Sequence, residues 1–147
     1  MDAGKAKQVA RNIFQRIQDS FPALRVNLIL TPGNVDMSLE IPIQTGMAFP
    51  VNLNLQRDEL HLNAGHFWAE WFPCTEDAVS ENYFNSVRRL ISGEYRIVET
   101  YRYGRAVGAV LEKPNGTGWI RLTSWKNFWI AFPGKSCYRV LQNKKLD

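Results

Sequence analysis

Apolar residues recur at intervals of three and four in the first part of the chain, which is the spacing of one face of an α-helix. These apolar positions are Ala6, Val9, Ala10, Ile13, Phe14 and Ile17. Pro22 disfavours helical backbone at the residue before it, so we expect the helix to end between Gln18 and Phe21. An amphipathic helix of this kind needs a second layer to cover its apolar face.

A second helix is predicted over 76–92. Its apolar face consists of Val79, Tyr83, Phe84, Val87, Leu90 and Ile91. Thr75 is a suitable N-cap, and Glu76 and Asp77 place negative charge where the free amides of a first helical turn favour it. Gly93 follows the last turn, where glycine readily adopts the left-handed conformation that ends a helix.

Between the two helices the pattern changes to a period of two, which is typical of antiparallel strands with one solvated face. Apolar and polar residues alternate over 35–41 and 49–55, and the alternation resumes over 60–62. Residues 24–30 form a further apolar stretch, and Gly33 in the turn that follows suits a position with positive φ. These segments predict a meander of four antiparallel strands.

The chain after the second helix is also typical of strands. Stretches over 95–103 and 106–111 precede Asn115-Gly116, which is the strongest short hairpin signal because both residues tolerate positive φ. Residues 119–125 and 136–141 are predicted to be strands as well. Residues 127–132 are either a strand or an aromatic loop.

The predicted fold class is therefore α+β. It consists of a helix, a four-strand antiparallel meander, a helix and three to five further antiparallel strands, with both helices packed on one face of the sheet. We expect a single domain over 1–147 with a frayed tail over 143–147, since a chain of this length can bury one sizeable core.

Residues 60–74 join the first predicted sheet to the second helix and contain both histidines. His61 is expected on the polar side of the fourth strand together with Glu59. From His66 onward there is no clear period. A helical turn would align His66 with Glu70, whereas a strand would place alternate aromatic residues on one side.

The composition is that of an ordinary globular protein, with 45% hydrophobic and 22% charged residues in a chain of 147. No run approaches the roughly 18 apolar residues that a membrane-spanning helix needs, and the first residues lack the apolar segment of a secretory signal. We therefore expect a cytoplasmic protein without a membrane partner. Cys74 and Cys137 are expected to remain thiols.

The net charge of +4 conceals an asymmetry between the two halves of the chain. Residues 1–85 carry six Lys and Arg against ten Asp and Glu, a balance of −4, and residues 86–147 carry twelve against four, a balance of +8. An anionic partner would therefore interact with the second half. Neutralisation of acidic by basic surface within the fold, or between copies, would also account for the asymmetry.

If the protein is a hydrolase or a metal-dependent enzyme, its candidate catalytic residues are His61, His66, Glu70 and Cys74. Imidazole, carboxylate and thiolate all bind zinc, but the spacing matches neither paired Cys-x-x-Cys nor His-Glu-x-x-His. Cys74 precedes a helix, where a thiol can be activated, yet no third group that would orient a histidine base can be named. We therefore expect no catalytic residue, no metal ligand and no cofactor.

Nucleic-acid binding is the main alternative function. Single strands are bound by basic grooves in which bases stack on aromatic side chains. The second half supplies the basic residues Arg96, Arg102, Arg105, Arg121, Lys126, Lys135 and Arg139. The aromatic residues between them are Tyr95, Tyr101, Tyr103, Trp119, Trp125, Phe128 and Trp129. No signature of a known nucleic-acid-binding fold accompanies them.

The sequence favours a small, non-catalytic protein-binding module, such as an adaptor, a specialised chaperone or a neutraliser of another protein. Aromatic residues with arginine at the rim are the composition of interface hot spots. The candidate binding residues are His66, Trp68, Glu70, Trp71, Arg96, Tyr101, Arg102, Tyr103, Arg105, Trp125 and Trp129. A partner protein is the first expectation and nucleic acid the second, and a homo-oligomer stays open.

Overall fold

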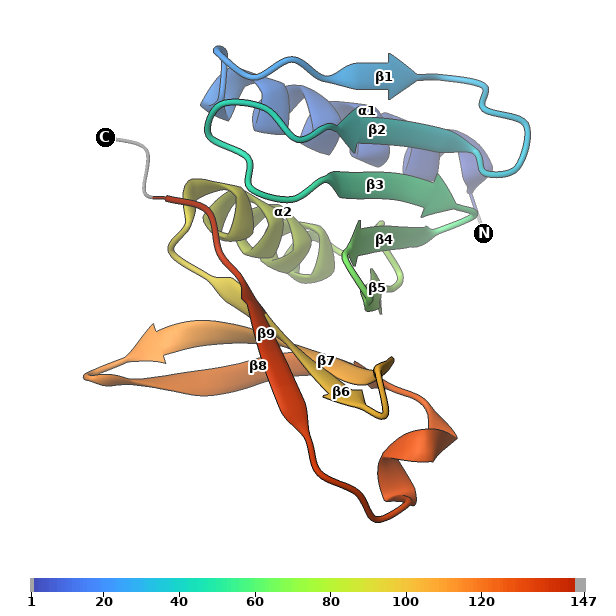
Figure 1. Cartoon of the computed structure of the whole chain (residues 1–147). Helices are drawn as coiled ribbons and strands as arrows, with labels where there is room; N and C mark the ends of the chain where they lie inside the picture. Colours follow the sequence, from blue (N-terminus) through green and yellow to red (C-terminus); the bar gives the residue numbers. More distant parts are fainter. Residues whose placement is uncertain (1, 145–147) are drawn as a thin grey trace.

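The computed structural model describes residues 2–144, with Phe128 described by its backbone only. The first half consists of α1 (Ala3–Ser20), β1 (Asn27–Ile29), β2 (Met37–Ile41), β3 (Val51–Gln56), β4 (Glu59–Ala64), β5 (Phe67–Trp71) and α2 (Asp77–Ser92). The second half consists of β6 (Arg96–Arg102), β7 (Arg105–Asn115), β8 (Gly118–Lys126), the 3-10 helix η1 (Phe128–Ala131) and β9 (Cys137–Leu141). The predicted α+β class is confirmed, with two antiparallel sheets in place of one (Figure 1).

Helix α1 forms where the spacing of apolar residues predicted it. Its buried residues are Ala6, Ala10, Ile13, Phe14 and Ile17, all from the predicted apolar face. Asp2 caps the first turn, since its carboxylate accepts a hydrogen bond from the amide of Lys5 at 3.1 Å. The helix ends at Ser20, and Phe21 is its C-cap. Pro22 disfavours helical backbone at Phe21, which accounts for this end point.

Helix α2 was also predicted correctly, apart from its first residue. The N-cap is Glu76, not Thr75, and it forms no side-chain capping bond. Gly93 adopts the left-handed conformation, with φ of 86°, and its amide donates to the carbonyl of Leu90. The helix therefore ends as the sequence predicted.

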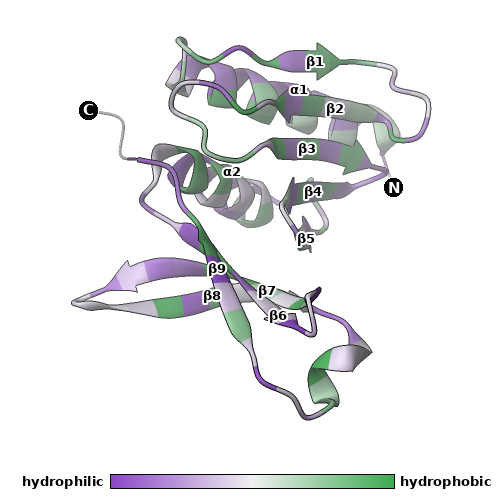
Figure 2. Cartoon of the chain, viewed as in Figure 1, coloured by the Kyte–Doolittle hydropathy of each residue, from purple (hydrophilic) through white to green (hydrophobic). Residues whose placement is uncertain are grey.

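Both helices cover one face of the first sheet, whose strands follow one another in chain order from β1 to β5 (Figure 1). Leu39, Leu53 and Leu62 are register partners on β2, β3 and β4, and all three are fully buried under the helices. Apolar and polar residues alternate along these strands (Figure 2). The opposite face of this sheet, which we call the polar face, therefore carries the asparagines, His61 and the acidic residues of the meander.

The meander has five strands, so the predicted number of four was wrong. Gly65, with φ of 57°, turns the chain after β4, and the aromatic stretch that follows returns as β5. Of the two interpretations left open for this stretch, the strand is correct. Phe67 and Ala69 face the core, whereas Trp68 and Glu70 lie on the polar face.

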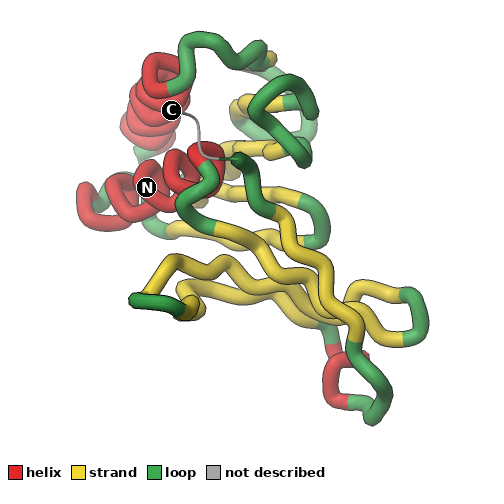
Figure 3. The backbone as a smooth tube through the Cα atoms, turned by 60° about the vertical axis from the view of Figure 1, so that its left-hand side comes forward, coloured by secondary structure: helices red, strands yellow, loops and turns green. Residues whose placement is uncertain are grey.

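The second sheet has the strand order β8-β7-β6-β9, so the last strand of the chain pairs with the first strand of this sheet. Ile97, Ala109, Leu111 and Leu141 are buried on its inner face, which packs against β5 and shares one hydrophobic core with α2. Figure 3 shows this sheet and its long β7–β8 hairpin below the helices. Residues 127–132, expected to be a strand or a loop, contain η1 instead.

The chain beyond β9 is anchored at Asn143, within the segment expected to be a frayed tail. Asn143 is only 3% exposed. Its side-chain oxygen accepts from the amide of Ala48 at 2.7 Å, and its side-chain nitrogen donates to the carbonyl of Ile91 at 3.2 Å. These hydrogen bonds join the loop between β2 and β3 to α2. Residues 145–147 lie outside the described part of the chain.

Candidate binding surface

One face of the second sheet lies away from the first sheet, and among the described elements only η1 packs on it, with Ile130 close to Gly108. Register partners on adjacent strands point to the same side of a sheet, so the inner residues define which side chains face outward. The outward residues include Arg96, Val98, Thr100, Arg102, Arg105, Val110, Glu112, Arg121, Ser124, Lys126, Tyr138 and Val140. We call this side the outer face. Tyr138 and Val140 are 69% and 49% exposed on it.

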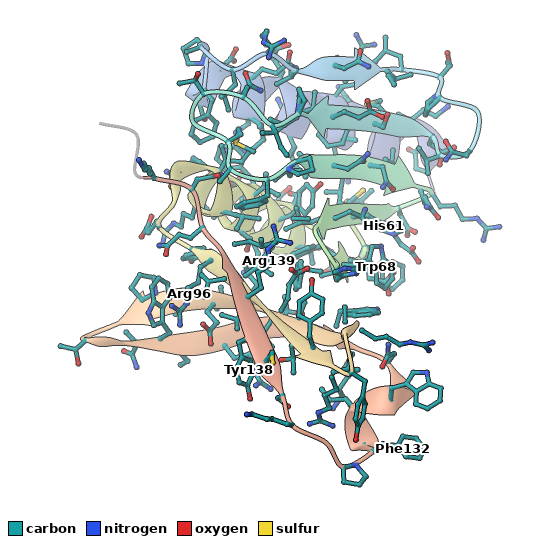
Figure 4. All side chains as sticks on the ribbon, in the orientation of Figure 1. His61, Trp68, Arg96, Phe132, Tyr138 and Arg139 are labelled. Carbon is teal, nitrogen blue, oxygen red and sulfur yellow. The ribbon has the colours of Figure 1, made fainter. Side chains whose placement is uncertain are left out.

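Arginines of the second half divide between the two sides of the sheet. Arg139 is the register partner of Glu99 and lies on the inner side, where it interacts with Tyr101. Tyr138 and Arg139 therefore project to opposite sides of β9 (Figure 4). The five outward basic residues are Arg96, Arg102, Arg105, Arg121 and Lys126.

Arg96 is already engaged within the protein. Its Nε lies 2.9 Å from a carboxylate oxygen of Glu112, and its guanidinium carbon lies 3.9 Å from the centre of the Trp119 ring. A planar guanidinium that stacks on an indole and pairs with a carboxylate is held in one orientation. Arg96 therefore gives one end of the outer face a fixed, largely neutral surface.

At the other end of the outer face lies a cavity of about 570 Å³. Its lining residues are Arg102, Tyr103, Arg105, Val107, Trp129, Phe132 and Pro133. Four of these were predicted as binding residues, and the structure brings them together. Sequence reasoning missed the other three, although Phe132 is the last residue of the segment predicted as a strand or an aromatic loop and Pro133 follows it directly.

The cavity forms where the loop after β8 is hydrogen-bonded to the end of β6 and to the turn between β6 and β7. Arg102 donates to Ser136 Oγ at 3.0 Å, to the carbonyl of Phe132 at 2.7 Å and to the carbonyl of Ile130. The hydroxyl of Tyr103 donates to the carbonyl of Pro133 at 3.3 Å. Arg102 is thus a structural residue, because its donors are occupied by the loop that it holds.

Arg105 has a different environment from Arg102, its register partner. Its side chain is exposed at the mouth of the cavity, and it forms neither a hydrogen bond nor an ion pair with any described residue. Tyr103, Trp129 and Phe132 beside it are 83%, 47% and 51% exposed. The cavity therefore combines apolar walls with one guanidinium whose donors are available.

His66 and Tyr101 meet at the junction of the two sheets, away from the cavity. Their rings pack edge to face with centres 5.8 Å apart. The buried carboxylate of Glu99 accepts from the amide of His66 at 2.7 Å and from the hydroxyl of Tyr101 at 3.0 Å. Burial, and next the hydrogen bond to Glu99, raise the pKa of Tyr101. This cluster connects the sheets.

Trp68 and Glu70 lie in a third place, on the polar face of the first sheet beside His61. The rings of Trp68 and His61 pack edge to face with centres 5.3 Å apart, and Glu70 Oε2 lies 3.7 Å from His61 Nε2 (Figure 4). The sequence predictions named Trp68 and Glu70 as binding residues and placed Glu59 beside His61 without naming it as a binding residue; Glu59 Oε2 lies 3.0 Å from the same nitrogen. The alternation of β4 was the signal that groups Glu59 with His61.

Trp71 and Trp125 are half-buried and pack against the core. Trp71 Nε1 donates to the side chain of Asn82 on α2 at 2.7 Å, and the Trp71 ring packs edge to face against Tyr83. Trp125 is the register partner of Ala109 on the inner side of the second sheet. The structure therefore places these two predicted binding residues between layers rather than on the outer face.

The four groups of the catalytic interpretation do not converge. His61 and Glu70 are close to each other, but the His66 ring packs against Tyr101 and Cys74 is fully buried. Burial, and next the nearby carboxylate of Asp58, raise the pKa of the Cys74 thiol, which opposes formation of a nucleophilic thiolate.

The two thiols are expected to react at very different rates, because Cys137 is exposed and Cys74 is buried. With Ellman's reagent at pH 8, we expect one thiol to react rapidly in the folded protein and the second only after unfolding in guanidinium. The Cys137→Ser variant should lose the rapid phase. Rapid reaction of Cys74 in that variant would contradict the buried position of this thiol.

Comparisons with protein-family models, with curated proteins and with solved structures give no match to this chain. Among residues 2–144, no helix combines the length and the apolar character needed to cross a membrane.

Proposed function

We propose that this chain is a non-catalytic protein-binding module that docks a partner on the outer face of the second sheet and inserts an apolar partner side chain into the cavity. The observation that carries the proposal is that Arg102, Tyr103, Arg105 and Trp129, chosen from sequence as binding residues, line one cavity. A cavity of about 570 Å³ is large enough for a buried aromatic or aliphatic anchor. We retain the cytoplasmic location that the sequence predicts.

Charge and apolar surface together indicate the chemistry of the partner. Val98, Val110 and Val140 form an apolar strip across β6, β7 and β9, since they are register partners on the outer face. Arg105, Arg121 and Lys126 surround this strip and the cavity, and no described carboxylate pairs with them. A partner segment with an apolar anchor flanked by Asp or Glu complements such a surface.

Single-stranded nucleic acid is a second candidate, and one observation favours it: five basic residues share the outer face. Two of them are already engaged, however, because Arg96 pairs with Glu112 and Arg102 donates to the loop after β8. A phosphate backbone would gain little from those two guanidinium groups. The apolar strip and cavity therefore support a protein partner more strongly.

The Arg105→Glu variant tests this proposal. Since Arg105 is exposed and unpaired among the described residues, the change should leave folding intact and weaken partner binding at least tenfold. Arg11→Glu is the matched control, because it makes the same charge change on the exposed side of α1. Protein should be captured from native lysate with each variant, at low and moderate salt, with and without nuclease.

A protein captured by the wild type and Arg11→Glu but lost with Arg105→Glu would support the proposal, provided that nuclease has no effect. Capture that nuclease abolishes and that falls steeply with salt would replace it with the nucleic-acid candidate. If Arg105→Glu and Arg11→Glu capture the same partner equally well, the outer face is not the binding surface.

A further inference from the structure

Three potential ligand atoms converge on the polar face of the first sheet, away from the outer face of the second. His61 and Glu70 are register partners on β4 and β5, and Glu59 lies two residues before His61 on the same side of β4. The nitrogen Nε2 of His61 lies 3.0 Å from Glu59 Oε2 and 3.7 Å from Glu70 Oε2. One ligand atom from each residue lies within 4.8 Å of the other two.

The imidazole in this cluster is held in place from several directions. His61 is 4% exposed, and the ring of Trp68 packs against it (Figure 4). Behind it, the fully buried hydroxyl of Tyr83 donates to the backbone carbonyl of His61 at 2.8 Å. The side chains of Glu59 and Glu70 are 37% and 46% exposed, so the side of the cluster that they form is open to solvent.

We propose that Glu59, His61 and Glu70 bind a divalent transition-metal ion, with Zn²⁺ as the representative. Ligand atoms about 2.1 Å from such an ion lie roughly 3.0 Å apart at right angles and roughly 3.4 Å apart at tetrahedral angles. The two observed distances from His61 Nε2 bracket these values. An imidazole ligand selects against Mg²⁺ and Ca²⁺, which prefer sites made only of oxygen atoms.

Asn54 lies beside His61 on the adjacent strand and carries a buried polar atom that is not hydrogen-bonded to His61 or to any other described residue. It is the register partner of His61 on β3, on the side opposite Glu70. Asn54 is 9% exposed, and its buried oxygen has no hydrogen-bond partner among the described residues. When Nε2 of a histidine binds a metal, Nδ1 carries the proton and needs an acceptor. We assign that positioning role to the unpartnered oxygen of Asn54.

The test uses the fact that the chain contains only two histidines. Untagged protein is titrated with Zn²⁺ at pH 7, and the ring nitrogens of both histidines are followed by long-range ¹H–¹⁵N NMR. We expect saturable one-to-one binding in which Nε2 of His61 shifts to a metal-bound value, Nδ1 of His61 is protonated, and His66 does not respond. Co²⁺, used in parallel, reports the coordination number through its visible absorption.

Variants distinguish this site from general binding to the surface. Glu70→Gln and His61→Gln are each expected to lower Zn²⁺ affinity at least tenfold by calorimetry. Glu70 is exposed, so that variant should fold normally even if His61→Gln does not. Asn54→Ala should weaken binding about tenfold and move the Nδ1 signal while His61 still responds.

His66→Gln and Glu40→Gln are the matched controls, because the first removes the other histidine and the second removes an exposed carboxylate from the same face. Both should bind Zn²⁺ as the wild type does. A titration that shifts neither histidine, or only His66, would refute the site. Unchanged affinity in Glu70→Gln would refute it as well.

Discussion

We expect the Gly93→Ala variant to lose about 2–4 kcal/mol of unfolding free energy, because it combines backbone strain with overpacking. Gly93 ends α2 with φ of 86°, a conformation that side chains with a Cβ rarely adopt. A Cβ at this position would overlap with the backbone carbonyl oxygen of Asn143 and would lie 3.0 Å from the carbonyl carbon of the same residue. Asn143 cannot easily retreat, since its side chain is hydrogen-bonded to Ala48 and Ile91.

Gly33→Ala is a control of nearly identical conformation. Gly33 has φ of 91°, but nothing lies within 4 Å of a Cβ built there. We therefore expect Gly33→Ala to cost only about 1 kcal/mol, which is the conformational part of the penalty. Urea unfolding followed by circular dichroism measures both variants. Equal losses would mean that the chain around Asn143 moves away without cost and is not the anchor described above.

Local periodicity was sufficient to predict both helices and most strands of this fold. The spacing of apolar residues predicts α1, and the same spacing together with Gly93 predicts α2. Both are helices, whose stabilising contacts repeat every turn. β5 was not resolved by the same approach, because its aromatic residues occur on both sides of the strand. Trp68 lies on the polar face although it is apolar, since its ring covers the imidazole of His61.

Strand partners could not be predicted, because alternation determines the side on which a residue lies and not the neighbouring strand. The pairing of β9 with β6 brings Tyr138 beside Thr100 and Arg139 beside Glu99 across nearly forty residues of chain. Because the sequence does not reveal that pairing, the seven basic residues of the second half were treated as one group. With the pairing, five lie on the outer face, Arg139 lies on the inner side of the sheet, and Lys135 lies in the loop before β9.

The same limitation explains why the predicted binding residues separate into several groups. Arg102, Tyr103, Arg105 and Trp129 meet at the cavity only because the loop after β8 returns to the turn between β6 and β7. None of the five tryptophans is fully buried, and Trp68 and Trp129 are 39% and 47% exposed. Composition does not indicate which tryptophans lie at the surface, since Trp71 and Trp125 pack against the core whereas Trp68 and Trp129 are exposed.

A buried carboxylate on β6 joins the two sheets, and its partner in the first sheet could not be predicted from the alternation of that strand. Glu99 is 1% exposed and accepts from the amide of His66, in the turn of the first sheet, at 2.7 Å. Gly65 permits this contact, because a Cβ there would lie 2.7 Å from Glu99 Oε2. A carboxylate in such a position accepts a hydrogen bond from a backbone amide of the other sheet and so links the two layers.

Glu99→Ala is therefore expected to lower the free energy of unfolding by about 3 kcal/mol, since it leaves the amide of His66 without an acceptor. Glu81→Ala is the control: it removes an exposed carboxylate that pairs with Arg16 between the two helices, and it should cost less than about 1 kcal/mol. Tyr101 provides a second measurement. Its pKa is raised partly by its hydrogen bond to Glu99, so it should fall in Glu99→Ala and remain unchanged in Glu81→Ala.

Urea unfolding at pH 7 and ultraviolet titration of the tyrosines measure these two effects. Equal destabilisation in both variants would show that the Glu99 bridge contributes no more than a surface ion pair. If the bridge does hold the sheets together, Glu99→Ala should also weaken partner capture without any change on the outer face. The β6 strand carries Glu99 on one side and Arg102 on the other, so loosening the inner contact displaces the scaffold of the cavity.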